Sequence, residues 1–145
     1  MLASESRQIF TQIEQMLAAC PRARHVRGLR SLSIPASGPE GFDVMLALDQ
    51  SECILCFDGW SLEFNRPEQA LHYVELALHG EMRLKIDSIG GRPWRWTVER
   101  LGPDRAWLVE NVMGFLRLRF WGEKRVTYLC NDFGFAGWTP KAAAG

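Results

Sequence analysis

Short segments in which apolar and polar residues alternate run through much of this 145-residue chain, and they constrain its fold more than any other feature. The clearest lie at 42–48, 82–86 and 94–98. Successive side chains of a strand point to opposite faces, so each segment predicts a strand with one buried face. The Asp-Gly pair at 58–59 and the Gly-Gly pair at 90–91 are typical of hairpin turns. The sequence therefore predicts antiparallel pairing of neighbouring strands.

Two segments have helical periodicity instead. Residues 4–20 place apolar side chains three and four positions apart, and residues 67–79 do the same. For the second helix Asn65 is the predicted N-cap and Gly80 the predicted stop. Both helices have one apolar face, which predicts that they pack on a sheet.

The remaining segments complete the predicted order of elements. Residues 21–41 are basic and rich in Pro and Gly without a clean period, so they are expected to form mainly a surface connection. Further strands are predicted at 53–57, 60–64, 106–109, 115–121 and 126–130, the last two pairing with each other around residues 122–125.

These elements predict an α+β fold. We expect a curved antiparallel sheet of about six to eight strands with two helices packed on one face, in the order helix, three strands, helix, four to five strands. With 145 residues, 47% of them apolar, the chain is expected to form one globular domain over 1–145, frayed at 1–3 and 141–145.

The four cysteines are embedded among apolar neighbours, as reduced thiols of a cytoplasmic protein would be. Cys53 and Cys56 form a C-x-x-C string. On a strand, residues three apart point to opposite faces, so these two thiols cannot share one metal ion. No apolar run reaches the ~20 residues of a membrane-spanning helix. The sequence predicts a cytoplasmic protein without bound metal.

Titratable residues give little indication of catalysis. Glu68, His72, Glu75 and His79 share one arc of the second helix, which is typical of a solvated polar face. No phosphate-binding loop, nucleophile elbow or zinc-protease motif is present. We therefore expect no enzyme, no cofactor and no catalytic residue.

Charge is unevenly distributed along the chain although its formal net charge is zero. Residues 40–80 contain eight acids and one base, a net charge of −7. Such an acidic field favours a basic partner, either another protein or the basic flanks of a second copy. The predicted partner-binding residues are Asp43, Asp49, Glu68 and Glu75.

Two alternatives use aromatic residues. A Trp-lined concavity formed by Trp94, Trp96 and Trp107 could bind a small ligand. Basic residues beside an aromatic one could contact phosphate or single-stranded nucleic acid, through Arg95, Arg117, Arg119 and Trp121. The preferred interpretation is a small cytoplasmic accessory or protein-interaction domain without a catalytic site.

Overall fold

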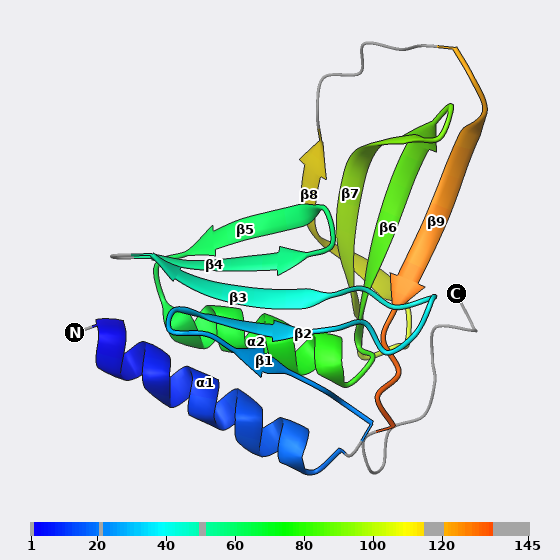
Figure 1. Cartoon of the computed structure of the whole chain (residues 1–145). Helices are drawn as coiled ribbons and strands as arrows, with labels where there is room; N and C mark the ends of the chain where they lie inside the picture. Colours follow the sequence, from blue (N-terminus) through cyan, green and yellow to red (C-terminus); the bar gives the residue numbers. More distant parts are fainter. Residues whose placement is uncertain (1, 21, 50–51, 115–120, 135–145) are drawn as a thin grey trace.

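The computed structural model describes residues 2–20, 22–49, 52–114 and 121–134, with side chains from residue 7 onward (Figure 1). Within them lie two helices, α1 (Leu2–Ala18) and α2 (Pro67–Leu78), and two antiparallel sheets. The five-stranded sheet contains β1 (Val26–Arg27), β2 (Ser31–Ile34), β3 (Val44–Asp49), β4 (Glu52–Phe57) and β5 (Trp60–Phe64) in chain order. The four-stranded sheet contains β6 (Met82–Ile89), β7 (Arg92–Leu101), β8 (Trp107–Gly114) and β9 (Lys124–Cys130) in the order β8-β7-β6-β9.

The predicted α+β class and antiparallel pairing are confirmed, and the strands divide between two sheets. Both helices lie on the same side of the five-stranded sheet (Figure 1). One face of that sheet supplies the core: Val44 lies opposite Phe57 and Leu46 opposite Leu55, all at most 1% exposed. Ile13 of α1 and Val74 of α2 join the same buried cluster. The alternation of apolar residues therefore places the core between this sheet and the helices.

The segment 21–41 contains more structure than expected. It forms β1 and β2, which pair with each other, and β2 also pairs with β3. Leu32 and Ile34 alternate with Ser31 and Ser33, and both apolar side chains are only 1% exposed. Residues 24–30 are exposed, as expected of a surface connection, but the prediction missed β2 because a four-residue strand between Gly- and Pro-rich stretches leaves a very short periodic signal.

The ends of α2 confirm the predicted stop but not the predicted cap. The N-cap residue is Arg66, which makes no side-chain capping bond, so Asn65 is not the cap. Pro67 occupies the first turn, where its missing N–H is not needed. At the other end Gly80 has φ 70°, and Glu81 N donates to Leu76 O over 2.9 Å. A glycine accommodates this left-handed turn without a Cβ clash, which ends the helix.

The ends of the chain also bear on the predictions. Helix α1 begins at Leu2, within the segment 1–3 that was expected to fray, and that expectation stays a prediction. Residues 141–145 lie outside the described part. No helix within that part is long and apolar enough to cross a membrane.

The four-stranded sheet is built on the predicted hairpin of β6 and β7. Gly90 and Gly91 turn the chain with φ 58° and 81°. One extra residue in β7 shifts the register at Asp87 and Ser88, which makes Trp94 a β-bulge. Strand β8 extends to Gly114, well beyond the predicted 106–109. Strand β9 pairs with β6, and the predicted partner segment, 115–121, lies outside the described residues except for Trp121.

Specific contacts join the two sheets. Trp60 of β5 is fully buried, and its indole Nε1 donates to Asn111 Oδ1 of β8 over 2.9 Å. The β4–β5 turn packs against Trp96, where a Cβ on Gly59 would lie 2.8 Å from the indole ring. This turn therefore needs a residue without a side chain. The contacts fix the base of the four-stranded sheet while its far end projects from the molecule (Figure 1).

Candidate functional site: the open face of the four-stranded sheet

The two faces of the four-stranded sheet have different surroundings. One face carries Leu84, Trp96 and Val98 into the core. The other face is here called the open face, and the strand registers show which residues lie on it. It presents Arg83, Lys85 and Asp87 of β6, Arg95, Thr97 and Glu99 of β7, Trp107, Val109 and Val112 of β8, and Lys124, Val126 and Tyr128 of β9.

Apolar side chains stand exposed along both edges of the open face. On β8, Val109 is 63% and Val112 53% exposed. On β9, Val126 and Tyr128 are each 48% exposed. Single exposed apolar residues are ordinary, but a group on one face is typical of a binding surface.

An ion pair occupies the middle of the open face. Arg83 Nε donates to Glu99 Oε1 over 2.7 Å, and the two residues are 8% and 9% exposed. The Arg83 guanidinium lies 4.5 Å from the ring centroid of Trp107 and 4.2 Å from that of Tyr128. Because aromatic rings flank the guanidinium from both edge strands, the pair is largely removed from water on a face that is otherwise open. The four side chains hold one another in place.

The charges on this face are not balanced. Asp87 and Arg95 form a second pair, with Arg95 Nε 3.0 Å from Asp87 Oδ2. Lys85 and Lys124 make no ion pair with any residue in the described ranges. The open face therefore has two bases in excess, and this excess favours acidic groups on anything that binds there.

Cys130 lies at the base of this face, opposite Arg83. Burial raises the pKa of its thiol to about 11, although the nearby Arg83 charge lowers it. The thiol lies 3.6 Å from the carbonyl oxygens of Gly80 and Met82. At neutral pH this sulfur is a protonated, apolar packing group and a poor nucleophile.

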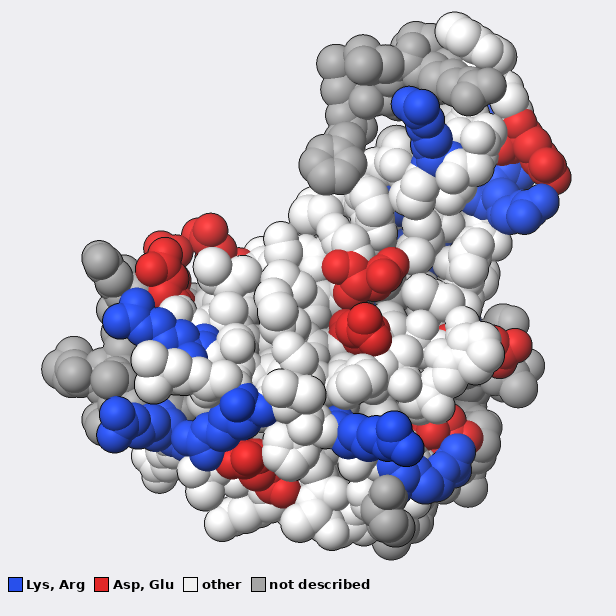
Figure 2. Space-filling model, viewed as in Figure 1, with Lys and Arg blue, Asp and Glu red and all other residues white. Residues whose placement is uncertain are grey.

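The predicted acidic surface is not one surface in the structure. Asp43 and Asp49 belong to the side of the five-stranded sheet that faces away from the helices, because Val44 between them points into the core. Glu68 and Glu75 are exposed on α2, which packs on the opposite side of that sheet. Figure 2 shows acidic side chains in separate groups on the visible face. The four residues do not share one field, and whether any of them binds a partner stays a prediction.

The three predicted pocket tryptophans do not line one concavity either. Trp96 is 7% exposed and packs into the core with Val98. Trp107 lies on the open face, opposite Leu101. Trp94 is the bulge residue, and the Arg95 guanidinium lies 4.6 Å from its ring centroid. Alternation along paired strands separates Trp96 from Trp107.

The predicted phosphate-binding residues are described only in part. Arg95 is paired with Asp87, which leaves less of its charge for a phosphate. Trp121 is 68% exposed. Arg117 and Arg119 lie outside the described residues.

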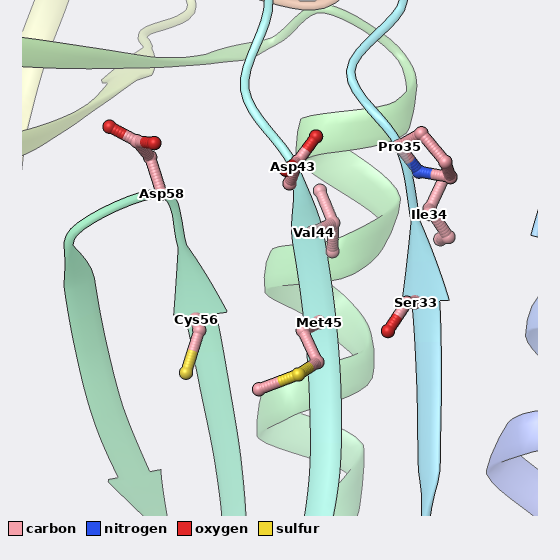
Figure 3. A pocket seen from close by; sticks show the side chains of 8 residues that line it. All are labelled: Ser33, Ile34, Pro35, Asp43, Val44, Met45, Cys56 and Asp58. Carbon is pink, nitrogen blue, oxygen red and sulfur yellow. The ribbon is translucent and has the colours of Figure 1, made fainter. Parts of the chain in front are cut away.

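A cavity of about 320 Å³ opens on the outer side of the five-stranded sheet (Figure 3). Ser33, Met45 and Cys56 line it on three neighbouring strands, and Asp43 and Asp58 lie at one end. The Asp43 carboxylate accepts a hydrogen bond from Ala36 N over 2.8 Å. Burial raises the pKa of the Cys56 thiol. The cavity has the size of a small-ligand site, but it is lined by none of the three predicted tryptophans.

A second cavity of about 470 Å³ lies where α2 approaches β8. Glu68 and His72 line it together with Tyr73 and Glu110. The Tyr73 hydroxyl donates to Glu110 Oε1 at 3.5 Å, and burial followed by the Glu110 charge raises the pKa of Tyr73. A raised pKa keeps this phenol protonated at neutral pH, so it is suited to hydrogen bonding and not to acting as a base.

Cysteine and metal-ligand geometry were also predicted. All four cysteines are free thiols, and Cys53 is buried whereas Cys56 is half-buried on the other side of β4. Burial followed by the Glu68 charge raises the pKa of Cys53. Among the residues that the structure describes, no three His, Cys, Asp or Glu side chains are grouped so as to hold a metal ion.

Comparison of the chain with protein-family models, curated proteins and solved structures gave no significant match.

The central group of the open face was missed by the sequence reasoning, apart from Trp107. Arg83 and Glu99 each lie on the polar side of a predicted strand. Their pairing depends on the register of β6 and β7, which the bulge at Trp94 shifts by one residue. A strictly regular hairpin would have paired Arg83 with Val98. The two edge strands then bring Trp107 and Tyr128 over the pair, and no local pattern indicates that β9 lies beside β6.

Proposed function

We propose that this domain is a protein-interaction module that binds a partner protein on the open face of its four-stranded sheet. One observation carries the proposal: half-exposed apolar side chains flank an Arg83–Glu99 pair that Trp107 and Tyr128 already hold in place. A solvated sheet face with no binding role would more commonly carry polar residues in the positions of Val109, Val112 and Val126.

The composition of this face supports binding. Trp, Tyr and Arg are the residues that most often dominate the energetics of protein interfaces. Here Trp107 and Tyr128 are held against the Arg83 guanidinium, so little side-chain entropy remains to be lost on binding. Covering the valines removes apolar area from water at roughly 25 cal/mol per Å². Such a surface is pre-organised for a flat or gently curved partner.

The partner is expected to be apolar with acidic groups. Lys85 and Lys124 are the two bases in excess on the open face. Carboxylates placed opposite them would steer the encounter and set the orientation. This partner differs from the basic one predicted for the acidic segment, because the apolar surface lies on the other sheet.

The domain is further proposed to act without catalysis, in the cytoplasm. Four free cysteines, buried or half-buried, are typical of proteins kept in a reducing compartment. The pKa of three of these thiols is raised by burial. Thiols of this kind are poor nucleophiles, which favours a packing role over a reactive one.

Site-specific photo-crosslinking in the native cell tests the proposal. A photo-reactive amino acid replaces Val112 on the open face, and in a matched protein it replaces Ser61, which is exposed on β5. Val112 should give one dominant cross-linked product of defined mass, and Ser61 should not. Equal products at both positions, or none at Val112, would contradict the proposal.

A matched pair of substitutions sharpens the test. Val109→Asp places a desolvated carboxylate in the proposed interface and should abolish the Val112 cross-link. Met45→Asp introduces the same charge on the outer side of the five-stranded sheet and should leave the Val112 cross-link unchanged. Because both sites are exposed, neither substitution should unfold the domain, which the thermal midpoint checks.

A further inference from the structure

Strand β9 forms one edge of the four-stranded sheet, and its outward backbone groups can be identified. Cys130 N donates to Glu40 O over 2.8 Å, so this N–H points away from β6. At the other end Gly90 N donates to Glu123 O over 2.9 Å, so Glu123 faces β6. Along an antiparallel strand the backbone groups of successive residues point alternately to the two sides. The contacts of Cys130 and Glu123 both place the even-numbered residues of β9 on the outward side. Lys124, Val126 and Tyr128 therefore direct their N–H and C=O groups outward.

No residue in the described ranges makes a hydrogen bond to the outward backbone groups of Val126 and Tyr128. Within the described residues, β6 is the only strand that lies beside β9 in the sheet. All seven residues of β9 pair with β6 without a bulge. A regular strand with unpaired outward groups readily accepts another strand.

We propose that two copies of this chain associate through their β9 strands, which pair antiparallel about a two-fold axis at Thr127. The two four-stranded sheets then become one sheet of eight strands, with the open faces of both copies on the same side. This inference goes beyond the proposed function and does not depend on it, because it uses the edge of the sheet and not its face.

The sequence of β9 is complementary to itself in this register. Val126 of each copy lies opposite Tyr128 of the other, and Thr127 lies opposite Thr127. Aromatic with β-branched pairs and Thr with Thr pairs are favourable across antiparallel strands. Arg125 lies opposite Leu129, so no like charges face each other. The two-fold arrangement therefore produces three favourable pairs from one strand.

Charge supports the same register. Glu40 is exposed and bound through its backbone at Cys130, which is where Lys124 of the second copy arrives. In this register an acidic residue of one copy and a basic residue of the other therefore come to the same end of the paired segment. The Glu40 contact with Cys130 N limits strand pairing to residues 125–129 of each copy.

Neighbouring registers are less favourable. Centring the pair on Arg125 sets two arginines directly opposite each other. Centring it on Tyr128 brings Val126 opposite Cys130, whose N–H already binds Glu40. Centring it on Val126 places Thr127 opposite Arg125 and sets apolar Leu129 opposite Glu123, which precedes β9. These differences allow an experiment to identify the register.

Charge substitution at Thr127 tests the proposal with the purified full chain. Thr127 is exposed, so Thr127→Glu and Thr127→Lys should each fold, with the far-ultraviolet circular dichroism spectrum of the unsubstituted chain. In the proposed register either variant sets two like charges face to face, and its dimer dissociation constant should rise at least tenfold. An equimolar mixture should form the mixed dimer, because opposite charges then meet. Sedimentation equilibrium gives the constants, and native mass spectrometry identifies the mixed species.

The outcomes separate this inference from the proposed function. The unsubstituted chain should sediment at twice its 16.5 kDa, and a monomer throughout the micromolar range would overturn the inference. A tighter dimer with Thr127→Glu alone would also overturn it, since Glu opposite Arg125 indicates the register centred on Val126. Val112→Asp on the far edge strand should leave the dimer constant unchanged while it removes partner binding.

Discussion

The two sheets of this protein differ in how their uncovered faces are built. Helices cover the apolar face of the five-stranded sheet, and its outer face carries Ser31, Ser33 and Ser61 together with two exposed apolar residues, Val26 and Met45. The four-stranded sheet instead exposes valines and Tyr128 around a buried ion pair. On the first sheet Ser33 lies between the two exposed apolar residues and separates them. The second leaves apolar surface exposed, which folding does not require.

The comparison separates the part of this protein that should determine stability from the part that is proposed to bind. The core residues that link the helices to the five-stranded sheet are all at most 8% exposed, and most are at most 1%. The four-stranded sheet joins this core at its base, and its upper part extends away from the body (Figure 1). Substitutions in the first region should therefore change the free energy of unfolding, whereas those of the exposed apolar residues on the open face should change binding.

The largest effect on stability is expected at Trp60, which connects the two sheets. Its ring is 0% exposed, stacks on Phe57 with centroids 5.0 Å apart, and bonds Asn111. Trp60→Ala should lower the free energy of unfolding by about 3–5 kcal/mol. Trp60→Phe retains most of the packing and removes the bond to Asn111, so it should cost clearly less. Urea unfolding measures both, and equal losses would contradict the assigned role of the indole.

Breaking the ion pair of the open face should have the next largest effect. Arg83→Ala leaves the Glu99 carboxylate buried without its partner, which should cost about 3 kcal/mol. Replacing Arg83 and Glu99 together by methionine should cost much less, because no charge then remains unpaired. Chemical denaturation of the unsubstituted chain and of the two variants gives the three free energies of unfolding. If the double variant were as unstable as Arg83→Ala, the loss of the Arg83–Glu99 pair, and not the unpaired charge of Glu99, would be the cause of the instability.

A matched pair of apolar truncations tests the comparison directly. Leu46→Ala in the five-stranded sheet should cost about 2–4 kcal/mol, because Leu46 is 1% exposed in the core. Val112→Ala on the open face should cost less than about 0.5 kcal/mol. If thermal unfolding showed similar losses of stability for Leu46→Ala and Val112→Ala, the open face would contribute to folding as much as the core does.

The smallest effect concerns acids on the outer side of the five-stranded sheet. A hydrogen bond with Glu63, and its negative charge, raise the pKa of Glu52. A carboxyl whose folded pKa exceeds its unfolded pKa stabilises the fold at low pH, and this contribution is lost as pH rises through the folded pKa. Glu63→Gln should therefore raise the thermal midpoint slightly at pH 7 and change it less at pH 4. An equal change at both pH values would exclude this cause.

Sequence patterning predicted the fold where the signal was local. The alternation at 42–48 and the glycines at 90–91 were sufficient for β3 and for the β6–β7 hairpin. The helix stop at Gly80 was predicted for the same reason. These features depend on residues close together in the chain, so a single sequence is enough to find them.

Features that depend on distant residues were not predictable in this way. The pairing of β9 with β6 brings together residues 35 to 47 positions apart, from Ile89 with Lys124 to Arg83 with Cys130, and no local pattern indicates it. The bulge at Trp94 changes the register by one residue, and that shift decides which acid meets Arg83. The predicted acidic surface failed as a single surface because a sheet with helices on one side has two sides. Charge counted along the chain does not distinguish between them.

Hydroxyl-radical footprinting tests most directly whether the open face binds a partner and the outer side of the five-stranded sheet does not. The chain is compared in buffer and in an extract of its native cell at one fixed concentration, so that self-association is the same in both. Oxidation of Trp107 and Tyr128 should fall in the extract, whereas that of Met45, which is 37% exposed, should not change. Unchanged oxidation of Trp107 and Tyr128 together with protection of Met45 would contradict the account.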